Sequence, residues 1–250
     1  MVLDVYGSSD IGCTRSLNED SFCIYGFDGN KLPGFCILSD GMGGHNAGEV
    51  ASQKTVQFMA EELLEVLNQS KNPAWPREIY RAVRTANDKV FKMADANQSQ
   101  QGMGATLVTA VVTEATTYIA NVGDSRAYAF RRQEMLQISK DHSVVEEMVA
   151  NGSITKEEAR VHPQRNIITR AIGTDPMVEP DIFEYDYLPG DCLLLCSDGL
   201  SGMVEDSEIL DVLKNQTDAK QMVTTLIDLA KEKGGRDNIT AVCIRFIQEG

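Results

Sequence analysis

The chain has 250 residues, 42% of them hydrophobic, and a net charge of −14. A chain of this length can bury one substantial core, so we expect a single domain over residues 1–250. The acidic balance argues against nucleic acid and anionic membranes as partners, because phosphate contacts need clustered Lys and Arg. The opening residues carry no secretory signal, and no apolar run approaches the ~18 residues of a membrane span. We therefore expect a cytoplasmic protein.

The predicted strands and helices are grouped in blocks along the chain. The first block contains short apolar stretches that predict strands at residues 3–6, 21–25 and 35–38. Turn residues at 28–30 predict that the last two strands form a β-hairpin. Apolar residues at helical spacing then predict two helices, at 47–69 and 78–97.

A polar loop at 98–102 follows the two helices. Short connections predict an antiparallel meander of four strands, at 106–112, 117–122, 125–130 and 135–138. Short amphipathic helices predict an excursion from the sheet at 141–170. The remaining elements are a strand at 192–196, helices at 206–214 and 219–233, and a strand at 239–246. Because helices come in pairs and strands in blocks, we expect an α+β fold of antiparallel sheets covered by helix pairs.

Cysteine and histidine offer few candidates for catalysis. The six cysteines form no Cys-x-x-Cys pair and four lie in apolar runs, so we interpret them as buried hydrophobes in a reducing compartment. Of the three histidines, His45 has the best claim to a functional role because it follows Asp40 closely. His142 and His162 are interpreted as structural or as part of the excursion.

Acidic residues stand at five ends of predicted strands. Three strands run out into Asp40, Asp124 and Asp198, each beside a glycine, and two are entered from Glu19-Asp20 and Asp237. A single Asp-Gly step after a strand is usually only a turn. Antiparallel neighbours, however, place the exit of one strand beside the entry of the next, so these five ends can share one edge.

Clustered carboxylates raise one another's pKa values unless a cation neutralises them. Ligation by oxygen alone selects Mg²⁺ or Mn²⁺ over Zn²⁺. The adjacent glycines leave room for a backbone carbonyl or a substrate oxygen to approach the ions. The pattern therefore predicts a divalent-metal site.

Eight motifs resemble, in order and across essentially the whole chain, the PP2C-type (PPM) serine/threonine phosphatases of the bacterial branch. They are Arg15-Ser16-Leu17-Asn18-Glu19-Asp20, Ser39-Asp40-Gly41-Met42-Gly43-Gly44-His45, Met103-Gly104-Ala105-Thr106, Asn121-Val122-Gly123-Asp124-Ser125-Arg126, Lys140-Asp141-His142, His162-Pro163, Ser197-Asp198-Gly199-Leu200 and Gly234-Gly235-Arg236-Asp237-Asn238. The resemblance implies a four-layer αββα sandwich, with two antiparallel sheets between helix pairs and a binuclear metal centre at one end.

Carried over residue by residue, the resemblance implies that Asp40 bridges two Mn²⁺ or Mg²⁺ ions. The Gly41 carbonyl would bind one ion, and Asp198 and Asp237 would hold the other. Asp124, with Asp198, matches positions that hold a weaker third ion.

Further positions follow from the same resemblance. Glu19 and Asp20 would act mainly through metal-bound water, and Arg15 matches the guanidinium that grips the substrate phosphate. The excursion at 141–170 matches the mobile flap beside the active site. Met42 stands where many eukaryotic members carry a histidine that acts as the general acid, so the proton donor is left open.

The activity implied is hydrolysis of phosphoserine and phosphothreonine in proteins by water activated between the two metals, without a phosphoenzyme. Phosphoproteins are the expected partners, with a cognate Ser/Thr kinase acting on overlapping substrates, and we expect a monomer. Three alternatives were weighed. A silent, binding-only domain would lack metal aspartates, a nuclease would carry a basic groove, and a calcium module would contain an Asp-x-Asp-x-Asp-Gly loop.

Overall fold

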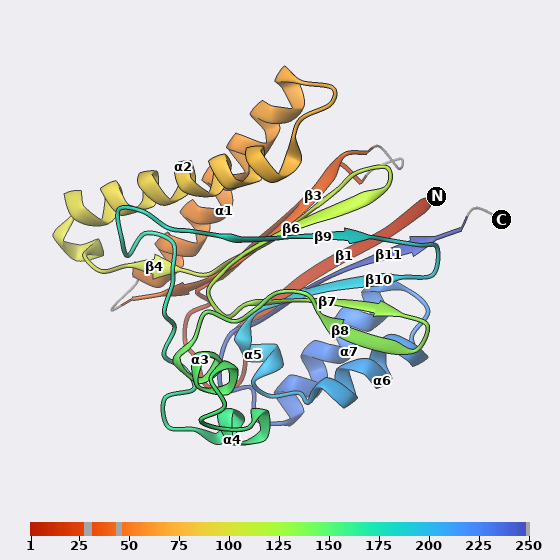
Figure 1. Cartoon of the computed structure of the whole chain (residues 1–250). Helices are drawn as coiled ribbons and strands as arrows, with labels where there is room; N and C mark the ends of the chain where they lie inside the picture. The colour runs from red at the N-terminus through yellow and green to blue at the C-terminus, as the bar shows by residue number, and fades with distance from the viewer. Residues whose placement is uncertain (28–31, 44–46, 249–250) are drawn as a thin grey trace.

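The structure is a computed structural model that describes residues 1–27, 32–43 and 47–248. Two antiparallel sheets lie face to face, and helices cover the outer surface of each (Figure 1). The expected α+β fold with its four αββα layers is confirmed. The turn predicted at 28–30 lies outside the described residues, but the two strands that flank it pair antiparallel as a hairpin requires.

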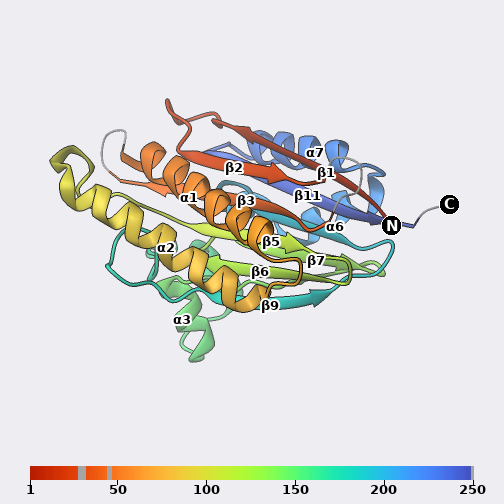
Figure 2. The same cartoon turned by 90° about the horizontal axis from the view of Figure 1, so that it is seen from above.

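The first sheet has the strand order β2-β3-β5-β6-β9. These strands are β2 (Asp20–Tyr25), β3 (Gly34–Met42), β5 (Leu107–Val112), β6 (Thr116–Val122) and β9 (Asp181–Asp186), and the short β4 (Gly104–Ala105) pairs with the end of β3. Two long helices, α1 (Ala47–Gln69) and α2 (Trp75–Ala96), cover its outer face, and the 3-10 helix η2 (Gln98–Gln100) follows them. Figure 2 shows α1 lying along β2 and β3, and α2 lying nearer β6.

The second sheet has the strand order β1-β11-β10-β7-β8. Its strands are β1 (Val2–Asp10), β11 (Ile239–Ile247), β10 (Cys192–Cys196), β7 (Arg126–Arg131) and β8 (Glu134–Gln137). Three helices lie against it, namely α5 (Asp198–Ser201), α6 (Asp206–Asn215) and α7 (Ala219–Glu232). Along the described ranges, no helix is both long and apolar enough to cross a lipid bilayer.

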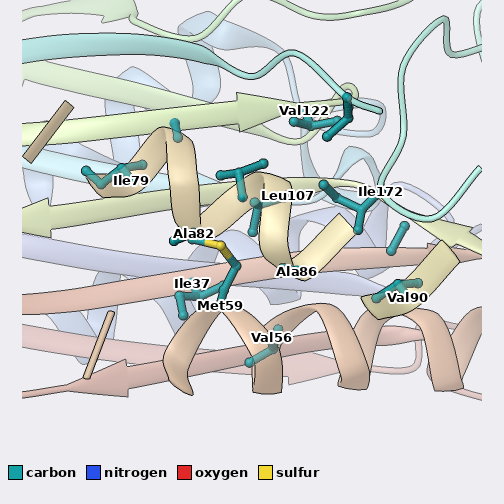
Figure 3. Close-up of a cluster of buried hydrophobic side chains, with 14 of the residues drawn as sticks. Ile37, Val56, Met59, Ile79, Ala82, Ala86, Val90, Leu107, Val122 and Ile172 are labelled. Atoms are coloured by element: carbon teal, nitrogen blue, oxygen red, sulfur yellow. The ribbon is translucent and has the colours of Figure 1, made fainter. Parts of the chain in front are cut away.

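Apolar side chains fill the spaces between all four layers. Figure 3 shows part of the layer under α1 and α2, where Met59 reaches toward Ala82 beside Ile37 and Leu107 of the sheet. Strand β10 is buried over its whole length because helices cover one face and the other sheet covers the opposite face. This burial fixes which way each strand faces, and with it the position of the strand ends. All six cysteines are free thiols, and four of them are buried.

The excursion leaves the sandwich after β8 and contains α3 (Val144–Ala150) and α4 (Lys156–Val161) (Figure 1). Ser143 caps α3 by accepting a hydrogen bond from the Glu146 N–H, and Thr155 forms a capping box with Glu158 at the start of α4. The two ends of the excursion meet, because Ser143 and Ile168 form an isolated antiparallel bridge.

The structure differs from the predicted secondary structure at α2 and β9, among other places. Helix α2 begins at Trp75 rather than at residue 78, because Pro76 occupies its first turn, where a proline is well tolerated. Strand β9 was missed, because its apolar residues do not all face one way. Ile182 packs toward the helices α1 and α2, whereas Phe183 and Tyr185 pack between the two sheets.

Candidate metal centre

The acidic strand ends gather at one end of the sandwich, as predicted. In the first sheet, Asp20 at the start of β2 is paired directly with Asp40 near the end of β3. In the second sheet, Asp198 follows β10 and Asp237 precedes β11, which is the antiparallel neighbour of β10. Asp124 lies in the turn between β6 of the first sheet and β7 of the second.

A cavity of about 280 Å³ opens between these strand ends. It is lined by Arg15, Glu19, Asp40, Gly41, Met42, Gly43, Thr106, Asp124, Asn166, Ile168, Asp198, Asp237 and Asn238. Every predicted site residue except Asp20 is in this set. Asp20 is buried, with 8% of its surface exposed, and lies opposite Asp40 in the pairing of β2 with β3.

Asp20 joins the two sheets. Its Oδ2 accepts hydrogen bonds from Ser197 Oγ at 2.8 Å and from Thr240 Oγ1 at 2.6 Å, both in the second sheet's half of the site. Within the part of the chain that the structure describes, its other oxygen, Oδ1, is buried without a hydrogen-bond partner, and so is Oδ1 of Asp198. A buried carboxylate oxygen without a partner carries a large desolvation penalty, which a cation or a cation-bound water would offset.

Asp40 is held through its backbone. Its N–H donates to Thr106 Oγ1 at 2.9 Å, and its carbonyl accepts from the Thr106 N–H at 2.8 Å. Thr106 Oγ1 in turn lies 2.7 Å from Ser125 Oγ, beside Asp124. These bonds fix the backbone of Asp40 at the edge of the cavity.

The glycines after Asp40 and Asp198 allow close packing of the chain. A Cβ at Gly41 would lie 2.0 Å from the Gly48 carbonyl oxygen, and one at Gly199 would lie 1.9 Å from the Asn238 carbonyl oxygen. Close packing is thus one reason for glycine at these positions, and the room that they leave for a ligand stays a prediction. The two glycines allow α1 and the start of β11 to close against the two strand ends.

The carboxyl groups repel one another, as predicted for clustered acids. Burial is the largest cause that raises the pKa of Asp40 well above its ordinary value, and the charges of Asp20, Asp198 and Asp124 add to it. Burial likewise raises the pKa of Asp20 to about 7 and that of Asp124 to about 8. The pKa of Asp198 is raised by burial and by the charge of Asp237. A divalent cation would reverse these shifts by favouring the ionised forms.

The donor set fits divalent cations that bind oxygen. The cavity collects carboxylates, and the buried oxygens of Asp20 and Asp198 have no partner. Among the described residues, no three His, Cys, Asp or Glu side chains are arranged to hold an ion unaided. Any ion bound there would need carbonyl or water oxygens as further ligands, and the use of the Gly41 carbonyl stays a prediction.

Sequence reasoning missed several residues of the site. Asn238 accepts a hydrogen bond from the Glu19 N–H at 2.8 Å and donates to the Ile11 and Leu17 carbonyls, so it ties the 11–19 loop to the start of β11. Its place directly after Asp237, in a quoted motif, was a signal for it. Asn166 and Ile168 reach the cavity from the excursion, and no spacing in the sequence could have indicated this.

The three histidines lie in different places relative to the cavity and to the described residues. His45 lies outside the described residues. His142 is buried at the base of the excursion, and His162 caps the end of α4. In the part of the chain that the structure describes, no histidine lines the cavity, whereas Met42 does.

Comparison with known proteins defines the class. The Protein phosphatase 2C family model matches residues 5–239. The serine/threonine phosphatase stp of Listeria innocua is 36% identical over 247 residues, which cover 97% of this chain and 96% of the relative. The chain therefore belongs to the protein phosphatase 2C family of metal-dependent serine/threonine phosphatases, which confirms the resemblance found in its motifs.

Solved structures agree with this assignment. The serine/threonine phosphatase PstP/Ppp of Mycobacterium tuberculosis matches with a TM-score of 0.88 and 36% identity, over 99% of this chain and 100% of that chain. The catalytic domain of PstP in complex with two manganese ions matches with a TM-score of 0.86 and 34% identity, over 99% of each chain.

Proposed function

We propose that the chain hydrolyses phosphoserine and phosphothreonine in proteins at the cavity between its strand ends, by direct attack of water on phosphorus. The observation that carries this proposal is the meeting of Asp40, Asp198 and Asp237 with one exposed guanidinium, Arg15, in a single cavity. Bound metals would supply Lewis-acid chemistry and an activated water there.

Asp40, the Gly41 carbonyl, Asp198 and Asp237 are the proposed ligands of two Mn²⁺ or Mg²⁺ ions. Asp124, which shares the cavity with Asp198, is proposed for a weaker third ion. Glu19 and Asp20 would hold metal-bound water, and the partnerless Oδ1 of Asp20 supports this role.

The chain's own groups support direct attack. Among the described residues, neither a cysteine nor a serine lines the cavity, and the one hydroxyl there, that of Thr106, is engaged by the Asp40 N–H and by Ser125. Arg15 presents planar N–H groups that suit a phosphate, and 46% of its side chain is exposed. Its role is to bind the phosphate and offset the charge that develops on it. A cognate Ser/Thr kinase that phosphorylates the same proteins fits this activity.

The test is hydrolysis of p-nitrophenyl phosphate and of a phosphothreonine peptide with Mn²⁺, Mg²⁺ or EDTA. We expect both substrates to be hydrolysed with either metal and neither with EDTA. Activity that persists in EDTA, or none with any metal, would refute the proposal. A burst of alcohol product before the steady state would refute the direct attack alone, because a burst indicates a covalent intermediate.

A further inference from the structure

His142 is the residue at which the excursion leaves the sandwich, and its side chain is almost fully buried. Its backbone N–H donates to the Gly123 carbonyl at 2.9 Å, and the Gly123 N–H donates to Nδ1 of the ring at 3.1 Å. Gly123 has a φ of +99° and directly precedes Asp124. The ring therefore fixes the turn that presents Asp124 to the cavity.

One tautomer of the ring satisfies its contacts with Gly123 and Asp181, whereas the Arg170 guanidinium, which can only donate, forms no hydrogen bond with the ring in that tautomer. A backbone N–H can only donate, so Nδ1 is unprotonated and Nε2 carries the proton. Nε2 lies 3.2 Å from Oδ2 of Asp181, the first residue of β9, which accepts this proton. Arg170 Nη1 binds the other oxygen of Asp181 at 3.0 Å and lies 3.2 Å from Nε2. Burial is the largest cause that lowers the pKa of His142, which favours the neutral ring.

The same residue also fastens the returning end of the excursion. The His142 carbonyl accepts a hydrogen bond from the Thr169 N–H at 2.8 Å. Asn166 and Ile168, which lie just before Thr169, line the cavity together with Asp124. His142 thus contacts both the turn before Asp124 and the segment that carries the excursion's cavity-lining residues.

We propose that His142 is a positioning residue that ties the excursion to Asp124 and thereby sets the Mn²⁺ concentration that the reaction requires. The inference rests on the proposed function, in which Asp124 holds the weaker ion. Loss of the ring's acceptor would free the 123–125 turn and spread the orientations of the Asp124 carboxylate. Residues that orient metal ligands change metal affinity by about 10-fold to 100-fold when they are replaced.

Two variants test the two nitrogen atoms of the His142 ring separately. His142→Asn places an amide oxygen near the position of Nδ1, where it can still accept from the Gly123 N–H, whereas His142→Gln places its amide near Nε2 and loses that acceptor. Calorimetric titration with Mn²⁺ measures the affinity for the weakest ion without turnover, and initial rates with p-nitrophenyl phosphate across a Mn²⁺ titration give the concentration for half-maximal rate. We expect His142→Gln and His142→Ala to raise it about tenfold, and His142→Asn to stay within about threefold of wild type.

Asn87→Ala is the matched control. The buried Asn87 accepts from the Gly173 N–H at 2.8 Å and donates to the Asp175 carbonyl at 3.0 Å, without touching the Asp124 turn. It should lower the thermal midpoint while leaving the Mn²⁺ requirement unchanged.

The inference would be overturned if His142→Asn and His142→Gln needed the same Mn²⁺ concentration for half-maximal rate. It would also be overturned if Asn87→Ala raised this concentration as much as His142→Gln does. The Asn and Gln pair decides the question even if His142→Ala does not fold. A wild-type protein without Mn²⁺-dependent hydrolysis would refute the proposed function instead.

Discussion

Nη2 of Arg15 lies 2.9 Å from Oδ2 of Asp237, so the guanidinium proposed for the substrate phosphate is paired with a proposed metal ligand. The same guanidinium is 3.8 Å from Glu19. Because 46% of the Arg15 side chain is exposed, an ion pair of this kind contributes only about 0–1 kcal/mol to stability. A cation at Asp237 and a phosphate at Arg15 can therefore separate the pair at little cost.

Replacement of Arg15 tests whether its guanidinium exchanges Asp237 for the substrate phosphate. Arg15→Lys keeps the charge but loses the planar pair of donors, and Arg15→Ala loses both. A hydrogen bond to a charged group contributes about 1.5–3 kcal/mol, so we expect kcat/KM for p-nitrophenyl phosphate to fall about tenfold to a hundredfold in Arg15→Ala. Arg15→Lys should recover only part of the loss. Steady-state kinetics at saturating Mn²⁺ measure both, and a wild-type kcat/KM in Arg15→Ala would contradict the assignment.

Replacement of the proposed bridging ligand should separate activity from stability. We expect Asp40→Asn and Asp237→Asn each to lower the rate at least about a hundredfold, more than the loss of a group that only orients a ligand. In EDTA, Asp40→Asn should melt at a higher temperature than wild type, because it removes one of the mutually repelling charges. Near-normal turnover in either variant would show that the ligand assignment is wrong.

Without metal, the stability of the fold should decrease as the pH rises. Carboxyl groups whose folded-state pKa is raised stabilise the fold below their ordinary pKa, and that stability is lost as the pH rises through the raised values. These are about 7 for Asp20 and about 8 for Asp124, against an ordinary value of 3.8. In EDTA, we therefore expect the thermal midpoint to fall between about pH 4 and about pH 8 and to level off above that.

Saturating Mn²⁺ should abolish this fall, because a bound cation favours the ionised carboxylates. Asp124→Asn should make the fall in EDTA shallower at its upper end, since it removes the group with the pKa of about 8. Thermal melts across this pH range measure all three cases. A midpoint that stays level in EDTA would argue against a buried, repelling cluster.

Whether Asp124 binds only the weaker third ion can be measured directly. Asp124→Ala should lower the rate or raise the Mn²⁺ concentration that it requires while leaving the two tighter ions in place, because the Asp124 carboxylate is proposed as a ligand of the third ion only. Calorimetric titration with Mn²⁺ counts the ions, and kinetics give the rate. Loss of both tight sites in this variant would refute the division between the binuclear pair and the third ion.

The sequence was sufficient to predict the layers and the location of the site. Apolar periodicity gave the helix pairs, and the acidic ends of buried strands gave the carboxylate cluster, because burial fixes strand register and register fixes where strand ends meet. Strand β9 was missed because its apolar residues pack on both faces of the sheet.

The polar contacts that support the site could not be predicted in this way. Asn238 bonds to Glu19 across 219 residues of sequence, and Asp20 bonds to Thr240 across 220. No local pattern connects such partners. Only tertiary packing brings them together, which is also why Asn166 and Ile168 were not expected in the cavity.

The contacts of Asp20 with Ser197 and Thr240 have a consequence for assembly. Asp20 belongs to one sheet and its two hydroxyl partners to the other half of the sandwich, so this carboxylate is correctly placed only after the halves have docked. Before the two halves dock, Asp20 therefore lacks these partners and the carboxylate cluster is incomplete. We therefore expect tight Mn²⁺ binding only by the chain whose two halves have docked.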